Sequence, residues 1–148
     1  MELSHLSLVH YRNLAQAVIP LDARFTVLWG HNGAGKTNLL EAIYLVSTYR
    51  SFRTNDQSSL VQFNEQEASV TLKAFNPVMG LNSDFQVRIK RHANSTRKRA
   101  SIDGKAVRAA RDFYGRVRAI PVSYTHLRAH ETEADLVCRL LLEKKKTE

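Results

Sequence analysis

The chain has 148 residues, of which 43% are hydrophobic and 24% are charged, and it contains one cysteine. This length corresponds to one domain with a buried core, and the composition excludes a wholly disordered chain, a disulfide scaffold and a multi-cysteine zinc site. The sequence has neither an apolar run of about 18 residues nor a leader-like N-terminus, which predicts a cytoplasmic protein that does not associate with membranes.

The net charge of +8 is concentrated in one segment. Residues 84–122 contain eleven Lys or Arg residues and three Asp residues, whereas the segments on either side are neutral. A local excess of this kind is typical of a surface that binds a polyanion, so we predict a nucleic-acid partner. The alternative interpretation is a solvated face rich in Lys and Arg.

The first part of the chain predicts strands followed by a helix. Residues 2–9 alternate loosely between apolar and polar side chains, which indicates a strand, and a short strand at 17–19 follows a polar turn. The largely apolar run at 25–29 is typical of a strand buried on both faces. An amphipathic helix is then predicted by apolar side chains three and four apart, at Leu39, Ala42, Ile43 and Val46.

The second part predicts antiparallel hairpins. Period-two alternation indicates two strands joined by a turn that contains Pro77 and Gly80, and Asp103-Gly104 favours a further tight hairpin turn. The predicted elements are, in order, a loop at 49–59, strands at 68–75 and 84–92, a short helix at 106–116 and a strand at 118–122.

The strongest motif is G-x-x-x-x-G-K-[ST], which runs from Gly30 to Thr37 between the predicted strand and helix. Gly33 and Gly35 permit backbone conformations in which amides approach a phosphate, and the positive end of the helix dipole favours the same anion. We expect Lys36 to reach the β- and γ-phosphates and the Thr37 hydroxyl to bind Mg²⁺. The alternatives are a glycine-rich turn without a ligand and, more weakly, a dinucleotide-binding loop.

The loop Asn32-Gly33-Ala34-Gly35-Lys36-Thr37 resembles that of ABC-type ATPases. Three flanking segments narrow the resemblance to the RecF recombination and repair ATPases: Tyr11-Arg12-Asn13-Leu14, Asn38-Leu39-Leu40-Glu41-Ala42-Ile43-Tyr44 and Arg50-Ser51-Phe52-Arg53. The resemblance covers residues 1–122, and its first half is the more specific.

The resemblance implies an α/β fold, namely the N-terminal part of a P-loop ABC-type head like those of SMC proteins, with a mixed sheet and a P-loop helix. It also implies ATP and Mg²⁺ as cofactors, with Thr37 as the metal ligand and Arg12 as a candidate for stacking on the base. The nucleotide-binding residues implied are Gly30, His31, Asn32, Gly33, Ala34, Gly35, Lys36, Thr37, Asn38, Arg12 and Asn13.

Members of the RecF family bind DNA, dimerise around ATP and act with RecO and RecR in RecA loading, gap repair and the SOS response. The sequence contains no Ser-Gly-Gly pair and no apolar run that ends in Asp-Glu. Because the signature and Walker B motifs of such heads are missing, we assign no catalytic residue, although we expect the parent protein to be a weak DNA-dependent ATPase.

Residues 1–122 are therefore predicted to be a partial ATPase head (its first lobe), and residues 123–148 a non-native tail. His126 and His130 in that tail have the i, i+4 spacing of a metal site, but a solvated segment is the favoured interpretation. Two alternative functions remain open: an ABC-type head of another system, SMC-like or from a transporter, and an inert fragment without activity.

The basic segment predicts a DNA-binding face. Residues two apart in a strand project from the same side, so Arg88 and Lys90 are expected outside while Val87 and Ile89 face the core. We predict that phosphates are contacted, without sequence readout, by Arg88, Lys90, Arg97, Lys98 and Arg99. The competing interpretation is that these cations contact the remainder of a longer protein.

Overall fold

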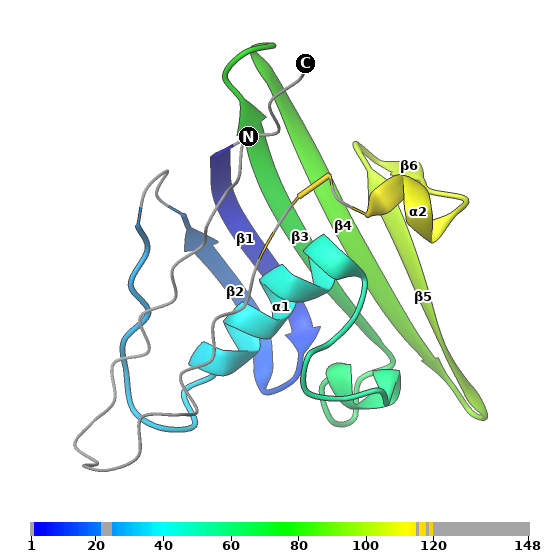
Figure 1. The fold of residues 1–148 in the computed structure, drawn as a ribbon. Coiled ribbons are helices and arrows are strands. Elements are labelled where there is room, and N and C mark those ends of the chain that lie inside the picture. The colour runs from blue at the N-terminus through cyan, green and yellow to red at the C-terminus, as the bar shows by residue number, and fades with distance from the viewer. Residues whose placement is uncertain (1, 22–24, 115, 118, 120–148) are drawn as a thin grey trace.

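A six-stranded sheet carries one long helix on one of its faces in the computed structural model, which describes residues 2–21, 25–114, 116, 117 and 119 (Figure 1). The strand order is β2-β1-β3-β4-β5-β6, and every pairing is antiparallel. The elements are β1 (Glu2–Tyr11), β2 (Leu14–Pro20), α1 (Lys36–Thr48), the 3₁₀ helix η1 (Gln57–Leu60), β3 (Glu67–Asn76), β4 (Leu81–His92), β5 (Ser95–Ile102), β6 (Lys105–Ala106) and α2 (Ala110–Phe113).

The predicted hairpins are confirmed, and β3 and β4 extend beyond the predicted bounds of 68–75 and 84–92. Strands β3 and β4 pair from Glu67↔Lys90 to Asn76↔Leu81, next to the turn at 77–80. The Asp103-Gly104 turn joins β5 to β6, with φ values of 50° and 75° at these two residues. Positive φ at both central residues matches the twist of the flanking strands, which is why Asp-Gly suits this position.

The predicted amphipathic helix is confirmed as α1, which packs its apolar stripe against the inner face of the sheet. The helix buries Ala42, Ile43, Leu45 and Val46. The sheet supplies alternate residues of its central strands, which are Leu6, Leu8, Val70, Leu72, Val87 and Ile89. This packing fixes the helix, and with it the glycine-rich loop that precedes it, relative to the sheet.

The strand expected at 25–29 is wrong. The structure assigns no strand to these residues, and Phe25, Val27 and Trp29 are 66%, 56% and 80% exposed. Side chains exposed to this degree do not fit a strand buried on both faces. The sheet described here is consequently antiparallel rather than mixed.

The helix expected at 106–116 is reduced to the single turn of α2, at residues 110–113. The predicted strand at 118–122 and the tail at 123–148, including His126 and His130, lie outside the described residues, apart from Ala119, which is in no strand. None of the helices described here is long and apolar enough to cross a membrane.

Candidate nucleotide site and basic sheet face

The N-terminus of α1 offers its free backbone N–H groups to a hollow of about 260 Å³. Gly35 caps the helix with φ at 97°, no side chain accepts a hydrogen bond from the first turn, and that turn contains no acidic residue. The positive end of the helix dipole is therefore uncompensated. The hollow is lined by His31, Asn32, Gly33, Gly35, Lys36, Thr37, Asn38 and Arg53.

Lys36 folds back over the loop that precedes it. Its Nζ donates to the carbonyl oxygen of Gly30 and, at 3.1 Å, to that of His31. The Ala34 amide also donates to the His31 oxygen, at 3.2 Å. Gly30 and Ala34 thus shape the loop without lining the hollow, whereas the other predicted loop residues line it.

Gly35 is fixed by close packing as well as by its backbone conformation. A β-carbon added there would meet Leu14 Cδ2 at 3.0 Å and Asn13 Oδ1 at 3.1 Å. At Gly33, where φ is 83°, an added β-carbon would meet nothing within 4 Å. Asn13 in the turn between β1 and β2, and Leu14 at the start of β2, therefore pack closely against the start of α1.

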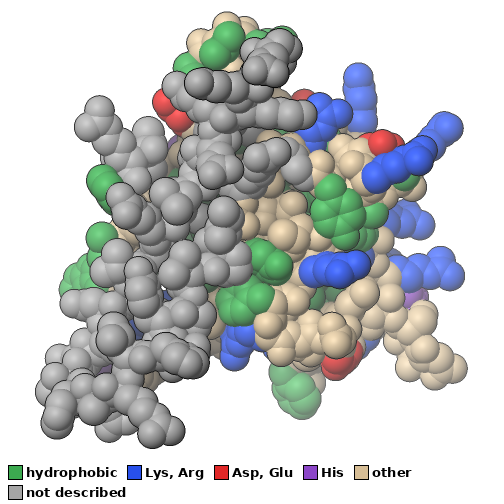
Figure 2. Space-filling model, viewed as in Figure 1, with side chains coloured by type: hydrophobic (Ala, Val, Ile, Leu, Met, Phe, Trp, Pro, Cys, Tyr) green, Lys and Arg blue, Asp and Glu red, His purple; other side chains and the backbone are tan. Residues whose placement is uncertain are grey.

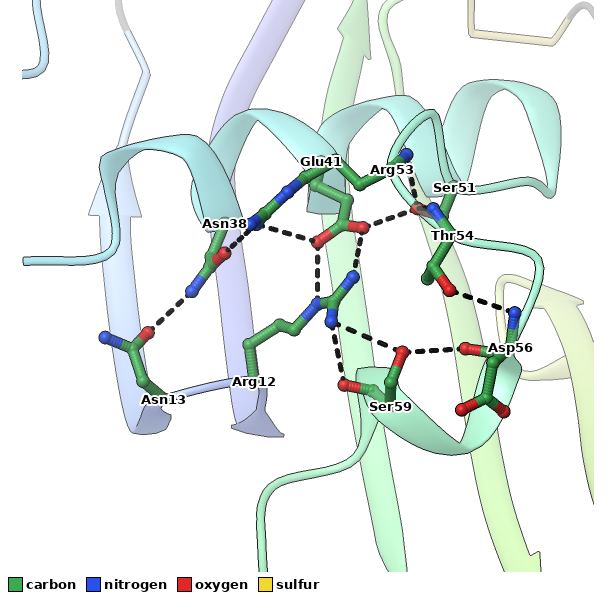
Figure 3. Close-up of polar contacts among 9 residues, drawn as sticks. All are labelled: Arg12, Asn13, Asn38, Glu41, Ser51, Arg53, Thr54, Asp56 and Ser59. Carbon is green, nitrogen blue, oxygen red and sulfur yellow. Dashed lines mark hydrogen bonds and ion pairs between the residues drawn. The ribbon is translucent and has the colours of Figure 1, made fainter. Parts of the chain in front are cut away.

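Hydrogen bonds continue from this contact along α1 (Figure 3). Asn13 Nδ2 donates to the Gly33 carbonyl oxygen at 3.0 Å, and Asn38 Nδ2 donates to Asn13 Oδ1 at 2.7 Å. Arg53, from the loop after α1, donates through Nη1 to Asn38 Oδ1 at 2.6 Å. The predicted residues Asn13 and Asn38 are therefore hydrogen-bonded to each other, and Asn38 is bonded in turn to Arg53, which was not predicted as a site residue.

Glu41 is the centre of this network and is fully buried on α1 (Figure 3). Its carboxylate accepts two hydrogen bonds from Arg12 and one from Ser51, and it forms an ion pair with Arg53 at 3.8 Å. Burial alone would raise the pKa of Glu41, but the hydrogen bonds from Arg12 and Ser51 and the positive charges outweigh it and lower the pKa. Glu41 is thus charged and holds two arginines in place.

Arg12 is held by this carboxylate rather than extended into solvent. Its Nη1 also donates to the carbonyl oxygen of Ser59, and its side chain is 17% exposed. It lines a second hollow of about 660 Å³ together with Asn13, Asn38 and Arg53. Asn38 and Arg53 line both hollows, so the two hollows lie next to each other.

The sequence profile of the RecF/RecN/SMC N-terminal domain family matches residues 2–117. The chain belongs to this family. It is 33% identical to the DNA replication and repair protein RecF of Geobacter metallireducens over 141 residues, which are 95% of this chain and 37% of the relative. It is 35% identical to RecF of a Synechococcus species over 123 residues, which are 83% of this chain and 31% of the relative.

Two solved structures resemble this RecF/RecN/SMC-type chain. The recombination mediator protein RecF with ATP, of the RecFOR pathway, matches with a TM-score of 0.70 and 26% identity over 82% of this chain and 32% of that one. The SMC head domain of Thermotoga maritima matches with a TM-score of 0.63 and 21% identity over 80% of this chain and 43% of that one, which shows the fold alone. The expected head fold is confirmed, and the chain spans about a third of its RecF relatives.

The outer face of the sheet in this RecF/RecN/SMC-type chain has four basic side chains at the β4–β5 hairpin. Arg88 is paired in register with Arg99, and Lys90 with Arg97, so all four share one face and are exposed. Val87 and Ile89 are buried on the other face, as predicted. No ion pair to these four cations is found in the described part of the chain.

The expectation that Lys98 shares this face is wrong. Lys98 is paired with Ile89 and therefore points to the side of the sheet that carries α1. There its Nζ donates to the Tyr49 carbonyl oxygen at 2.7 Å and lies 4.5 Å from the centre of the Tyr49 ring. Successive residues of a strand alternate between faces, so Arg97, Lys98 and Arg99 cannot all project together.

Seen from the helix side, Lys and Arg side chains project from the edge of the molecule that carries β5 and α2 (Figure 2). Like charges directly opposite each other on neighbouring strands destabilise a sheet. The Arg88–Arg99 and Lys90–Arg97 pairs therefore favour an anion that lies across them. Among the described residues, no three or more His, Cys, Asp or Glu side chains are grouped so that they could hold a metal ion.

Proposed function

We propose that this chain is the ATP-binding part of a RecF-type DNA replication and repair protein. The observation that carries the proposal is the glycine-rich loop, whose hollow receives the uncapped end of α1 and the Lys36 and Thr37 side chains. One solved structure that resembles this chain is named as RecF with ATP, which supports the same ligand. The phosphates would be bound by the loop amides and by Lys36.

The residues also fit Mg²⁺. Thr37 supplies a hydroxyl oxygen beside the phosphate hollow, and hard oxygen ligands are what Mg²⁺ prefers. The bound ion would neutralise charge on the phosphate oxygens. We assign Arg12 a positioning role, because its donors are engaged by Glu41 and Ser59, and we assign Asn13, Asn38 and the loop residues to nucleotide binding.

We propose that DNA phosphates lie across Arg88, Lys90, Arg97 and Arg99 on the outer face of the sheet. These cations are exposed and form no ion pair among the described residues, although Glu67 is in register with Lys90, and they can bind single- or double-stranded DNA without sequence readout. RecO- and RecR-type partners, an ATP-dependent homodimer, a role in the SOS response and a cytoplasmic location complete the proposal. These come from the resemblance to RecF.

An inert fragment is the second candidate. The sequence lacks the signature and Walker B motifs, so we expect this chain by itself to bind nucleotide without hydrolysing ATP above background. Turnover that depends on Lys36 would contradict that expectation.

DNA binding in the presence and absence of ATP and Mg²⁺ tests the function. We expect the double substitution Arg88→Ala/Arg97→Ala in the full-length protein to weaken duplex binding and to lower the salt slope by about 2, with nucleotide affinity unchanged. Lys105→Ala, which removes an exposed charge from β6, is the matched control. Unchanged duplex affinity and slope in the double variant would contradict the proposed DNA face.

A further inference from the structure

A third hollow, of about 340 Å³, lies at the opposite end of α1 from the glycine-rich loop. It is formed where Tyr49 and the loop after it meet Lys98 of β5 and Tyr114, which follows α2. Since α1 has 13 residues, roughly 20 Å of helix separates this hollow from the phosphate loop. The nucleotide proposed above therefore does not account for it.

Two cations face this hollow without an acidic partner. Lys98 and Arg50 both line it, and neither forms an ion pair within the part of the chain that the structure describes. Burial lowers the pKa of Lys98, and the charge of Arg50 lowers it further. An anion placed between the two side chains would relieve both effects.

The remaining lining favours a ligand with a planar group beside its charge. Asn55 and Gln57 also line the hollow, and their side-chain amides can donate and accept hydrogen bonds. The Tyr114 side chain is 40% exposed, whereas the Tyr49 ring is engaged by Lys98 and by an edge contact with Phe113. Tyr114 therefore offers a surface on which a base can stack.

The position of the hollow connects it with the outer basic face. Strand β6 pairs only with Ser101 and Ile102, so the rest of β5 is an edge among the described strands. At this edge Arg97 and Arg99 point outward while Lys98 points to the hollow. A flexible polyanion that lies on the outer face can pass around the edge, whereas a duplex is too wide to enter a hollow of this volume.

We propose that this hollow holds one nucleotide unit of a single-stranded nucleic acid, with its phosphate between Lys98 and Arg50 and its base against Tyr114. This inference rests on the proposed DNA-binding function and adds a second, strand-selective contact to it. An acidic side chain from elsewhere in the protein is the alternative occupant, and the test below distinguishes it.

The test compares single-stranded and duplex oligonucleotides by fluorescence anisotropy in the full-length protein. We expect Arg50→Ala to lower the salt slope for the single strand by about 0.7, and Tyr114→Leu to weaken single-strand binding about fivefold or more. Duplex affinity should be unchanged in both variants. Arg111→Ala is the matched control, since Arg111 is exposed on α2, is paired with Asp112 and lies outside the hollow.

Ultraviolet crosslinking provides a readout that does not depend on substitution. A single strand that contains 5-iododeoxyuridine should crosslink to Tyr114 in the unaltered protein. Crosslinks elsewhere, with wild-type single-strand binding in both variants, would overturn the proposal. So would reduced thermal stability in Arg50→Ala without a change in single-strand affinity, because that result assigns the hollow to an internal ion pair.

The failure of this inference is distinguishable from the failure of the proposed function. If duplex binding depends on Arg88 and Arg97 while the hollow variants bind single strands normally, only the inference fails. If the unaltered protein binds neither form of DNA, the proposed DNA-binding function fails as well.

Discussion

The Arg12 guanidinium and the Glu41 carboxylate form a bidentate pair, with Nη2···Oε1 at 2.7 Å and Nε···Oε2 at 2.9 Å. Arg12 belongs to the turn between β1 and β2, which packs on Gly35, and Glu41 lies on the helix that begins just after that glycine. The pair therefore adds a second contact between this turn and α1, beside the packing of the turn on Gly35. Its geometry fixes the position of α1 relative to the turn.

Replacing Glu41 with Gln removes the charge and keeps the shape. We expect the free energy of unfolding to fall by about 3 kcal/mol, because Arg12 keeps its burial and loses its counter-ion. Glu65→Gln is the control, since Glu65 is 44% exposed and lies 3.5 Å from His10. Denaturant unfolding at neutral pH measures both variants, and equal stability of the two would contradict the role given to Glu41.

The same pair predicts an acid dependence of stability. The pKa of Glu41 is lowered in the folded protein, so its contribution is complete above the ordinary value of 4.5 and is lost as the pH falls through the lowered pKa. We expect Glu41→Gln to lack this part of the acid-induced loss. Unfolding free energies measured from pH 6 downward would show parallel curves for the two proteins if the prediction is wrong.

Substitutions at Gly35 and Gly33 distinguish the cost of backbone strain from the cost of steric crowding. Both have positive φ, so an alanine at either position costs about 1–2 kcal/mol of backbone strain. Only at Gly35 does the added carbon also meet Leu14 and Asn13. We therefore expect Gly35→Ala to be the more destabilising of the two in denaturant unfolding. Equal losses would show that the packing against the β1–β2 turn contributes nothing.

Arg88 of β4 and Arg99 of β5 face each other, so removing one of the two charges is expected to raise stability and to weaken DNA binding. Arg99→Gln removes the like charge across from Arg88, so the Tm should rise at low salt, and this gain should disappear at high salt. The same substitution should lower the salt slope of duplex binding by about 0.9. Lys105→Gln is the control for a general loss of charge. A lower Tm for Arg99→Gln at low salt would contradict the electrostatic account.

Elements with local signals were predictable from the sequence. The β3–β4 hairpin follows from period-two alternation on both sides of a Pro- and Gly-containing turn, and the Asp103-Gly104 turn follows from its backbone preference. Side chains alternate between the two faces of a strand, so Lys98 lies on the other face of the sheet from Arg97 and Arg99. The position of Lys98 was therefore predictable from the sequence once β5 was recognised as a strand.

Features that depend on distant partners were not predictable. The run at 25–29 is apolar enough for a strand, but its composition does not show whether other strands lie beside it, and the structure assigns no strand there. Glu41 lies on a helix whose polar residues are expected outside, and only the arrival of Arg12, Ser51 and Arg53 from other segments makes its burial favourable. For the same reason, Arg53 received no role until the fold brought it beside Asn38.

Calorimetric titration of ATP with Mg²⁺ into the full-length protein and its Lys36→Ala variant tests the central claim most directly. The account predicts that Lys36→Ala lowers the affinity by about a hundredfold or more, since a cation is removed from beside the phosphates. Lys105→Ala, which removes an equivalent charge far from the loop, should leave the affinity unchanged. An unaltered dissociation constant in Lys36→Ala would contradict the assignment of this loop as the nucleotide site.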